Sequence, residues 1–397
     1  MEIQYGDNSI RMQIIHSKVQ GCAHRRTKMK IKVMTIFGTR PEAIKMSPLI
    51  KELESRSEIE SIVCVTAQHR RMLDQVLATF NIKSNFDLDI MKSGQTLVDI
   101  TTRVLQGLSK IIEKNTPDIV LVHGDTTTTL AGSLAAFYNQ VAIGHVEAGL
   151  RTYNKYSPFP EEVNRQITGI IADMHFAPTE DAKNNLISEG KLPENIIVTG
   201  NTAIDALKTT INENYSNQIL DNIENDRIIL LTAHRRENLG VKMRSIFSAV
   251  KRIIEEFDDV QVVYPIHMNP LVRETANEIF GDNDRIKIME PLEVLDFHNF
   301  MNKSYFIMTD SGGIQEEAPS LGKPVLVLRD TTERPEGVTA GTLKLTGVEE
   351  ESIYNMAKEL LLNKSLYQSM SKASNPYGDG NASKYIVDAI IDKFKTK

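Results

Sequence analysis

The stretch IVLVHGDTTTTLAGSLAAFYNQVAIGHVE, residues 119–147, decides the fold. Two short apolar runs in it, 119–123 and 141–146, have the length and the content of valine and isoleucine that are typical of buried strands. The segment between them, 127–139, has the length and pattern of a helix. A strand, a helix and a second strand form a βαβ unit, and such units build a parallel sheet with helices on both faces.

The same alternation runs through the chain from Lys30 onward. Before residue 200, further strands are expected at 31–37, 61–66, 175–177 and 196–199, and further helices at 41–55, 70–80, 96–114 and 161–172. After a polar, linker-like stretch at 212–226, strands are expected again at 228–232, 260–265, 285–289, 305–309 and 325–328. The sequence therefore predicts an α/β chain of two doubly wound, Rossmann-type domains, 30–200 and 201–379. A last helix, about 380–397, can pack back on the first domain.

Residues 1–29 differ from the rest of the chain, because they show neither a clear hydrophobic period nor helix caps. A hydrophobic strand begins abruptly after Met29. We interpret 1–29 as an extension that is not part of the fold, with Met29 as the functional start. A natural disordered tail is the alternative.

The composition excludes several classes of protein. Hydrophobic residues make up 41% and charged residues 25% of the chain, which is an ordinary globular composition. The net charge is −6, and acidic and basic residues are interspersed along the sequence, so no nucleic-acid partner is expected. Two cysteines, Cys22 and Cys64, supply neither a disulfide framework nor metal-ligand spacing, which suits a reducing cytoplasm. The sequence contains no run of about 18 apolar residues, so no membrane partner is expected either.

Ligands of open parallel sheets bind beyond the carboxyl ends of the strands. Both domains have polar, glycine-containing segments there, so the expected site is a cleft between the domains. The segment GTRPE, residues 38–42, follows the first strand. Arg40 can bind a phosphate with its forked guanidinium, and Lys45 lies one turn further on the same helix face. A solvated basic face is the alternative.

The segment DSGGIQEE, residues 310–317, follows a strand of the second domain. Ser311, Gly312 and Gly313 would present unpaired backbone N–H groups at a helix start, which can hold a phosphate. Glu317, one turn into this helix, can accept hydrogen bonds from ribose hydroxyls. An ordinary strand-to-helix turn capped by Ser311 explains the same residues.

Two consecutive strands end in His-x-acid, at Asp125 and Glu147, and Glu161 follows after a loop. Three carboxylates in one cleft push their pKa values apart, which yields the acid and base forms that proton transfer needs. A divalent metal site and plain structural hydrogen bonds are the alternatives. No tight H-x-x-x-H or C-x-x-C spacing supports a metal, so none is expected.

The segment AHRRE, residues 233–237, follows the first strand of the second domain. His234 and Arg235 suit an anionic leaving group at the rim between the domains, and Arg334, after another strand of the same sheet, suits the same group. Surface charge clusters are the alternative. The fingerprint G-x-G-x-x-G occurs nowhere in the sequence, so NAD is not expected as a cofactor.

Taken together, these segments resemble the non-hydrolysing UDP-N-acetylglucosamine 2-epimerases of bacteria, over nearly the whole chain from Met29. The matching stretches are TIFGTRPEAIKM (35–46), TAQHRRMLDQV (66–76), VLVHGDTTTT (120–129), GHVEAGLRT (144–152), AHRRE (233–237), TDSGGIQEEAPSLGKPVLVLRDTTER (309–334) and NPYGDG (375–380). Several of them are long and jointly specific. Residues 1–28 lie outside the resemblance.

The resemblance implies a GT-B-like pair of domains, a homodimer, and interconversion of UDP-GlcNAc and UDP-ManNAc for cell-surface polysaccharide biosynthesis. It assigns catalytic importance to Asp125, Glu147, Glu161 and His234. It assigns UDP contacts to Arg40, Lys45, Ser311, Gly312, Gly313, Glu317 and Arg334. It also suggests a second UDP-GlcNAc as an allosteric activator, with Gln68, His69 and Arg71 as contacts. Arg71 departs from the glutamine expected in some relatives.

The chemistry of such a reaction agrees with these residues. The proton on C2 of the sugar is weakly acidic, because no carbonyl lies next to it, but departure of UDP from C1 makes it acidic. Anti elimination through 2-acetamidoglucal and readdition of UDP would give the epimer, and the two faces of the sugar explain why more than one carboxylate is useful. A GT-B glycosyltransferase with a UDP-sugar donor is the main alternative, and a silent UDP-sugar sensor is another.

Overall fold

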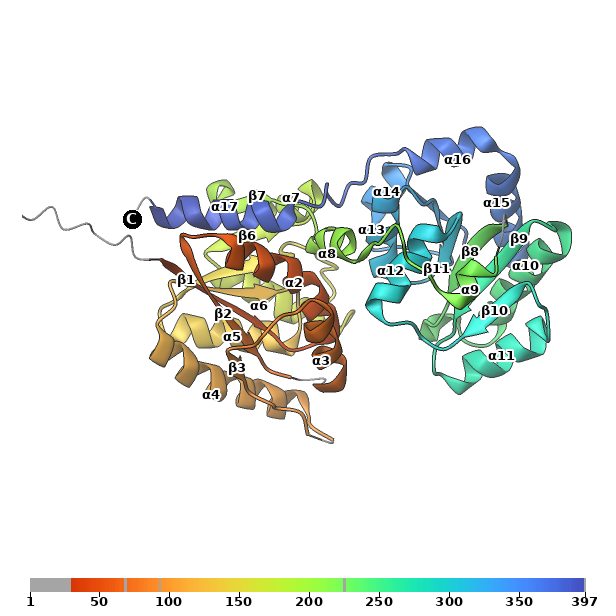
Figure 1. Cartoon of the computed structure of the whole chain (residues 1–397). Helices are drawn as coiled ribbons and strands as arrows, with labels where there is room; N and C mark the ends of the chain where they lie inside the picture. The colour runs from red at the N-terminus through yellow and green to blue at the C-terminus, as the bar shows by residue number, and fades with distance from the viewer. Residues whose placement is uncertain (1–29, 68–69, 93, 224–225, 396–397) are drawn as a thin grey trace, which may run out of the picture.

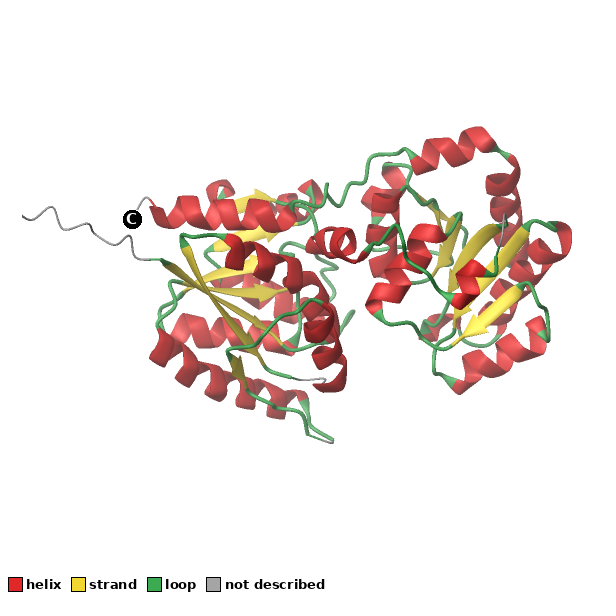
Figure 2. Ribbon diagram, in the orientation of Figure 1, coloured by secondary structure: helices red, strands yellow, loops and turns green. Residues whose placement is uncertain are grey.

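The computed structural model describes residues 30–67, 70–92, 94–223 and 226–395. The expected extension at 1–29 lies outside these residues. The strands of the described chain form two separate sheets, and helices cover both faces of each sheet (Figures 1 and 2). The α/β class and the two doubly wound halves that the sequence predicts are confirmed.

The first sheet has seven parallel strands in the order β3-β2-β1-β4-β5-β6-β7. They are β1 (Ile31–Phe37), β2 (Ile59–Val65), β3 (Phe86–Asp87), β4 (Ile119–His123), β5 (Ala142–Val146), β6 (Met174–Ala177) and β7 (Ile196–Val198). The central strand β4 is buried at every position, which explains its continuous apolar run. The strand order reverses between β1 and β4, and a ligand site is expected beyond the carboxyl ends of such a pair.

The second sheet has six parallel strands in the order β10-β9-β8-β11-β12-β13. They are β8 (Arg227–Thr232), β9 (Val260–Pro265), β10 (Ile286–Met289), β11 (Phe306–Thr309), β12 (Val325–Val327) and β13 (Leu343–Leu345). Its order reverses between β8 and β11, so it offers a second place for a ligand of the same kind. Strands β3 and β13 are missing from the sequence prediction, because two or three residues carry too little periodicity to be recognised.

Helices connect the strands and cover both faces of each sheet (Figure 2). In the first half they are α2 (Arg40–Ser55), α3 (Arg70–Thr79), α4 (Leu97–Asn115), α5 (Thr127–Tyr138), α6 (Glu161–Ile171), α7 (Glu180–Ser188) and α8 (Thr202–Thr210). The others are α9 (Gln218–Asp221), α10 (Val241–Glu256), α11 (Pro270–Phe280), α12 (Val294–Lys303), α13 (Gly312–Glu317), α14 (Pro335–Thr339), α15 (Glu350–Leu362), α16 (Lys364–Ser371) and α17 (Ala382–Lys395). Threonine side chains cap the starts of three helices beside the first sheet, at Thr96, Thr126 and Thr179.

The stretch 212–226 is more than the linker that its polarity suggested. It contains the short helix α9, and Ile223 is buried in the apolar core of the second sheet. Tyr215 packs against the same core and donates a hydrogen bond to Asp296 at 2.6 Å. Tyr215, Ile219 and Ile223 recur every four residues, which is a helical spacing, but the polar residues between them led to the interpretation as a linker.

The chain passes between the two halves twice, and the two passages touch. Gly200 and Gly378 both have positive φ, and a Cβ added to either would lie 2.9 Å from the Cα of the other. Only glycine fits both the conformation and the approach. After the second passage, α17 packs on α2 and buries Ile386 and Ile390 in the core of the first sheet (Figure 1). Helix α8 lies between the halves, against α2 on one side and α12 and α13 on the other.

None of the helices that the structure describes has both the length and the apolar character needed to cross a membrane.

Candidate active site

The three carboxylates singled out in the sequence lie near the carboxyl edge of the first sheet. Asp125 follows β4, Glu147 follows β5, and Glu161 is the first residue of α6. Burial raises the pKa of Asp125, and the negative charges of Glu147 and Glu161 raise it further against the opposing effect of Arg165. The fold thus brings Glu147 and Glu161 close enough to Asp125 to influence its protonation, as a proton-transfer site requires.

Glu147 is held in an unusual backbone conformation. Its φ is +61°, in the left-handed region that residues other than glycine avoid, at a cost of about 1–3 kcal/mol. Its carboxylate forms an ion pair with Lys45 and accepts a hydrogen bond from Asn201 at 2.9 Å. Burial opposes its ionisation, but the positive charges of Lys45, His123 and Arg334 outweigh burial and lower the pKa of Glu147. The side chain is therefore a charged, rigidly placed base.

Lys45 lies in α2, one turn beyond Arg40 as the sequence predicts, and its role as a phosphate ligand stays a prediction. In the structure its ammonium pairs directly with Glu147, and both side chains are largely buried. The opposite charges of Glu147 and Glu316 outweigh the effect of burial and raise the pKa of Lys45. Lys45 thus stabilises the charged form of the carboxylate.

Asp125 also has a cationic partner that the sequence did not reveal. Arg165, one turn into α6, lies with Nη2 2.7 Å from Asp125 Oδ2. The backbone carbonyl of Asp125 accepts a hydrogen bond from Asn164 at 2.9 Å. An arginine inside a helix has no distinctive sequence pattern. Only the folded structure shows that Arg165 lies beside the carboxylate of Asp125.

The turn that follows β1 is tied to the turn that follows β4 by one buried carboxylate. Glu42 accepts hydrogen bonds from the backbone N–H groups of Gly38 and Thr39, at 3.0 and 2.8 Å, and from the hydroxyl of Thr126 at 2.7 Å. These bonds fix the position at which Arg40 begins α2. Arg40 itself extends toward the second half, where its guanidinium lies 4.0 Å from Glu293.

His234 follows β8, and a buried acid from the neighbouring strand orients it. Asp310, at the end of β11, accepts hydrogen bonds from the backbone N–H groups of His234 and Arg235, both at 2.9 Å. Its second carboxylate oxygen lies 3.3 Å from Nδ1 of His234. The imidazole also stacks on His267, with 5.4 Å between ring centroids, and its side chain remains 42% exposed. The site residue missed here is Asp310, although it directly precedes the quoted Ser-Gly-Gly turn.

The Ser311-Gly312-Gly313 turn opens a short helix, as the sequence predicts a helix start there. Helix α13 has six residues and continues as a 3₁₀ turn at Ala318–Leu321. A Cβ on Gly312 would lie 3.4 Å from the guanidinium carbon of Arg334, and one on Gly313 would lie 3.9 Å from the Glu317 carboxylate. The turn therefore lies next to the two side chains that were proposed to bind the same nucleotide.

The remaining candidates of the second half have partners within that half. Arg334 donates from Nε to Glu316 at 2.7 Å, and Arg235 lies 3.7 Å from Glu333. Burial raises the pKa of Glu317 to about 8. Arg334, Arg235 and Ser311 are only partly buried, so each retains surface through which a ligand can be reached.

The proposed activator contacts fall largely outside the described chain. Gln68 and His69 lie outside the described residues, and only the backbone of Arg71, in α3, is described. Their assignment stays a prediction. Among the described residues, no group of three or more histidine, cysteine, aspartate or glutamate side chains is arranged to hold a metal ion.

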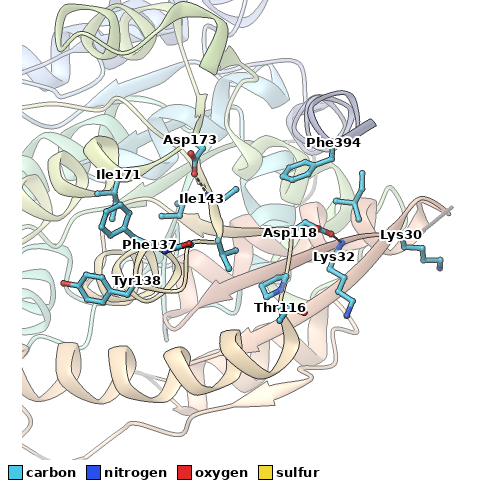
Figure 3. Close-up of a pocket in the computed structure, with 15 residues that line it drawn as sticks. Lys30, Lys32, Thr116, Asp118, Phe137, Tyr138, Ile143, Ile171, Asp173 and Phe394 are labelled. Carbon is cyan, nitrogen blue, oxygen red and sulfur yellow. Dashed lines mark hydrogen bonds between the residues drawn. The ribbon is translucent and has the colours of Figure 1, made fainter. Parts of the chain in front are cut away.

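A large hollow lies at the opposite edge of the first sheet. It has a volume of about 1250 Å³ and is lined by residues at the amino ends of the strands and by the end of α5 (Figure 3). Its two acids have structural roles, because Asp118 accepts the backbone N–H of Lys32 and Asp173 that of Ile143, both at 2.8 Å. This hollow therefore lacks the acid–base set that the carboxyl edge has.

An α/β chain of two Rossmann-type halves, with paired acids and cations at the carboxyl edges of both sheets, defines a two-domain enzyme of the GT-B-like class. Comparison with known families makes this more specific. The chain belongs to the UDP-N-acetylglucosamine 2-epimerase family, because the model of that family matches residues 51–391. The resemblance seen in the sequence is thereby confirmed.

Individual relatives agree with this membership over nearly their whole length. A UDP-N-acetylglucosamine 2-epimerase of Bacillus subtilis is 66% identical over 91% of this chain and 95% of its own. The structure of MnaA from S. aureus, solved with UDP, is 59% identical, with a TM-score of 0.85 over 92% of this chain and 97% of that chain. The Neisseria meningitidis enzyme bound to UDP-GlcNAc is 51% identical, with a TM-score of 0.82 over 91% of this chain and 100% of that chain.

Proposed function

We propose that this chain interconverts UDP-GlcNAc and UDP-ManNAc by inverting C2 of the sugar, through elimination and readdition of UDP. The observation that carries the proposal is a group of three carboxylates near the carboxyl edge of the first sheet, Asp125, Glu147 and Glu161, in which the negative charges of Glu147 and Glu161 raise the pKa of Asp125. Binding alone does not need three clustered acids. Moving a proton on and off one carbon from two faces makes use of more than one acid–base group.

The first step breaks two bonds, C1–O and C2–H, and forms two, the second bond of C1=C2 and the O–H bond of the carboxyl group that takes the proton. The C1–O bond breaks, and UDP leaves with the bonding electron pair. The C2–H proton passes to a carboxylate, its electron pair forms the C1=C2 double bond, and 2-acetamidoglucal remains. Readdition of UDP to C1, with delivery of a proton to the opposite face of C2, gives the epimer. Positioned acids and bases contribute about 10²–10⁴ in rate to such proton transfers.

The cations and the glycine turn would serve the departing nucleotide. Arg40, Arg235 and Arg334 supply forked donors for the diphosphate, and the N–H groups of Ser311, Gly312 and Gly313 supply more. Glu317 would meet the ribose hydroxyls. His234, oriented by Asp310, would stabilise charge on the departing UDP oxygen. Lys45 keeps Glu147 charged before substrate binds and offers a second interaction to the phosphates.

The proposal extends to the assembly and to its regulation. We infer a cytoplasmic homodimer that uses neither NAD nor a metal and that supplies cell-surface polysaccharide biosynthesis. A second UDP-GlcNAc, bound through Gln68, His69 and Arg71, would act as an activator. Its support is the sequence resemblance, and a sigmoidal rate curve with UDP-GlcNAc would test it.

The proposal is tested by incubating the purified chain with UDP-GlcNAc alone and following the sugar anomeric signals by NMR. Formation of UDP-ManNAc to a stable ratio, from either direction, is expected. A GT-B glycosyltransferase would leave UDP-GlcNAc unepimerised without an acceptor, and a sensor would leave it unchanged. Either result would contradict the proposal.

A further inference from the structure

One asparagine joins the carboxylate edge of the first sheet to the second sheet. Asn201 lies where the chain first passes between the halves, and it is 3% exposed. Its Nδ2 donates to Glu147 Oε2 at 2.9 Å and to Glu316 Oε2 at 2.6 Å. Glu147 follows β5 of the first sheet, whereas Glu316 lies in α13 beside the second sheet. The two N–H groups of a single amide are thus shared between carboxylates of the two halves.

The orientation of this amide is fixed from three directions. Its Oδ1 accepts the backbone N–H of Ala203 at 2.9 Å, which caps α8. Its backbone N–H donates to Tyr377, at 2.7 Å, on the second passage between the halves. Since the oxygen is committed to the cap, the nitrogen must face the two carboxylates. Rotation of the amide would place an acceptor against two acceptors, which is unfavourable in a buried site.

Helix capping alone does not explain an asparagine at this position. A cap needs one side-chain oxygen, and serine, threonine or aspartate provides it as well. The nitrogen has a separate role, because Glu147 and Glu316 are like charges that approach the same point. Each has its own cation, Lys45 for Glu147 and Arg334 for Glu316, and Asn201 supplies the neutral donor between them.

We propose that Asn201 is a positioning residue. Through Glu316, it couples the orientation of Glu147 to the position of the second sheet relative to the first. A hydrogen bond weakens steeply beyond its normal length, so a shift of about 1 Å between the halves would break one of the two bonds. A diphosphate that draws Arg334 away from Glu316 would leave Asn201 as the side-chain donor on that carboxylate. The nucleotide site and the acid–base site are then linked through this amide.

The inference rests on the proposed role of Glu147, and Asn201→Ser tests it. Serine keeps an oxygen for the cap of α8 but cannot reach either carboxylate. We expect kcat to fall about tenfold or more, the loss expected when a bond to a charged group is removed. The Kd of UDP should change less than kcat does, because the amide reaches the nucleotide site only indirectly, through Glu316 and Arg334. An unchanged kcat, or a loss confined to the Kd of UDP, would overturn the inference.

Asn375→Ala is the matched control. Asn375 lies on the second passage and donates to the backbone oxygen of Glu316 and the hydroxyl of Ser320, but it contacts no carboxylate. Its loss should leave kcat within about twofold while removing a similar number of hydrogen bonds. An equal fall of kcat in Asn201→Ser and Asn375→Ala would show that loosening of the passage is responsible, and the coupling would be wrong.

A double-mutant cycle with Glu316→Gln tests the link between the halves. If Asn201 acts through Glu316, the double variant should be no slower than the slower single variant, whereas independent effects would multiply. Multiplying losses would overturn the coupling. Glu147→Gln, measured in parallel, distinguishes a failure of the proposed role of Glu147 from a failure of the coupling alone. Normal turnover of Glu147→Gln would refute the proposed role of Glu147, whereas an inactive Glu147→Gln with a normal Asn201→Ser would refute the coupling alone.

Discussion

The carboxyl edges of the two sheets each hold a buried glutamate, and the two are tuned in opposite directions. Glu147, at the edge of the first sheet, has its pKa lowered, because Lys45, His123 and Arg334 outweigh its burial. Glu317, at the edge of the second, has its pKa raised to about 8 by burial, only partly offset by Lys45. Lys45 thus keeps Glu147 charged, whereas burial keeps Glu317 protonated and able to donate a hydrogen bond at neutral pH.

The backbone conformation also differs between the two edges. The first edge presents its acid on a residue in a strained left-handed conformation, held by an ion pair and an amide. The second presents glycines at the start of a six-residue helix, where a ligand can approach the backbone closely. The comparison indicates that the first edge performs the chemistry and that the second holds the nucleotide.

The largest expected effect separates these two roles. Glu147→Gln, Asp125→Asn and Glu161→Gln should each lower turnover by about 10²–10⁴, because each removes a group that carries or steers the proton. The Kd of UDP, measured by calorimetry, should change little. Near-normal turnover in all three variants would show that the first edge does not perform the chemistry.

Removal of a cation should have the reverse pattern. Arg334→Ala and Arg40→Ala should weaken UDP binding by about 10- to 100-fold, as expected when charge-assisted hydrogen bonds to a phosphate are lost. Arg244→Ala is the control, because Arg244 forms a surface ion pair with Glu278 on the outer helices. UDP affinity that falls equally in the control, or in none of the variants, would contradict the assignment of Arg40 and Arg334 to UDP binding.

The smallest effect concerns stability and pH. The pKa of Glu317 is about 8 in the folded chain and lies near 4.5 without burial. Between these two pH values the folded state therefore keeps a proton that the unfolded state releases. Its contribution to stability is full below the lower value and is lost as the pH rises through about 8. The Tm of the wild type should therefore fall more between pH 6 and pH 9 than that of Glu317→Gln. Parallel curves would show that Glu317 is already charged at neutral pH.

Much of this comparison could be predicted from residue order alone. Strand ends can be recognised from short apolar runs, and the rule for parallel sheets places Asp125, Glu147 and the Ser311 turn at carboxyl edges. Family membership, too, could be predicted from the long motifs. The two-residue strand β3 could not, because it is too short to have a period, and the packed segment around Ile223 was missed because polar residues surround its helically spaced apolar residues.

The partners that tune the site are beyond sequence reasoning for a physical reason. Asn201 and Glu316 are 115 residues apart, and Lys45 and Glu147 are 102 apart. Such pairs form only when both sheets have folded. Asn201 has the sequence context of an ordinary helix N-cap, and no pattern indicates that its side chain also donates to two carboxylates. Lys45 was recognised as important, but the distance between Lys45 and Glu147 in the sequence hid its ion pair.

The most direct test of the central claim is the fate of the C2 hydrogen in D₂O. If a carboxylate of the first edge takes this proton, it should exchange with solvent, and NMR should show deuterium at C2 of both UDP-GlcNAc and UDP-ManNAc and at no other carbon. Small amounts of UDP and 2-acetamidoglucal should accumulate with time, and Glu147→Gln should abolish the incorporation. Epimerisation with protium fully retained at C2 would contradict the account.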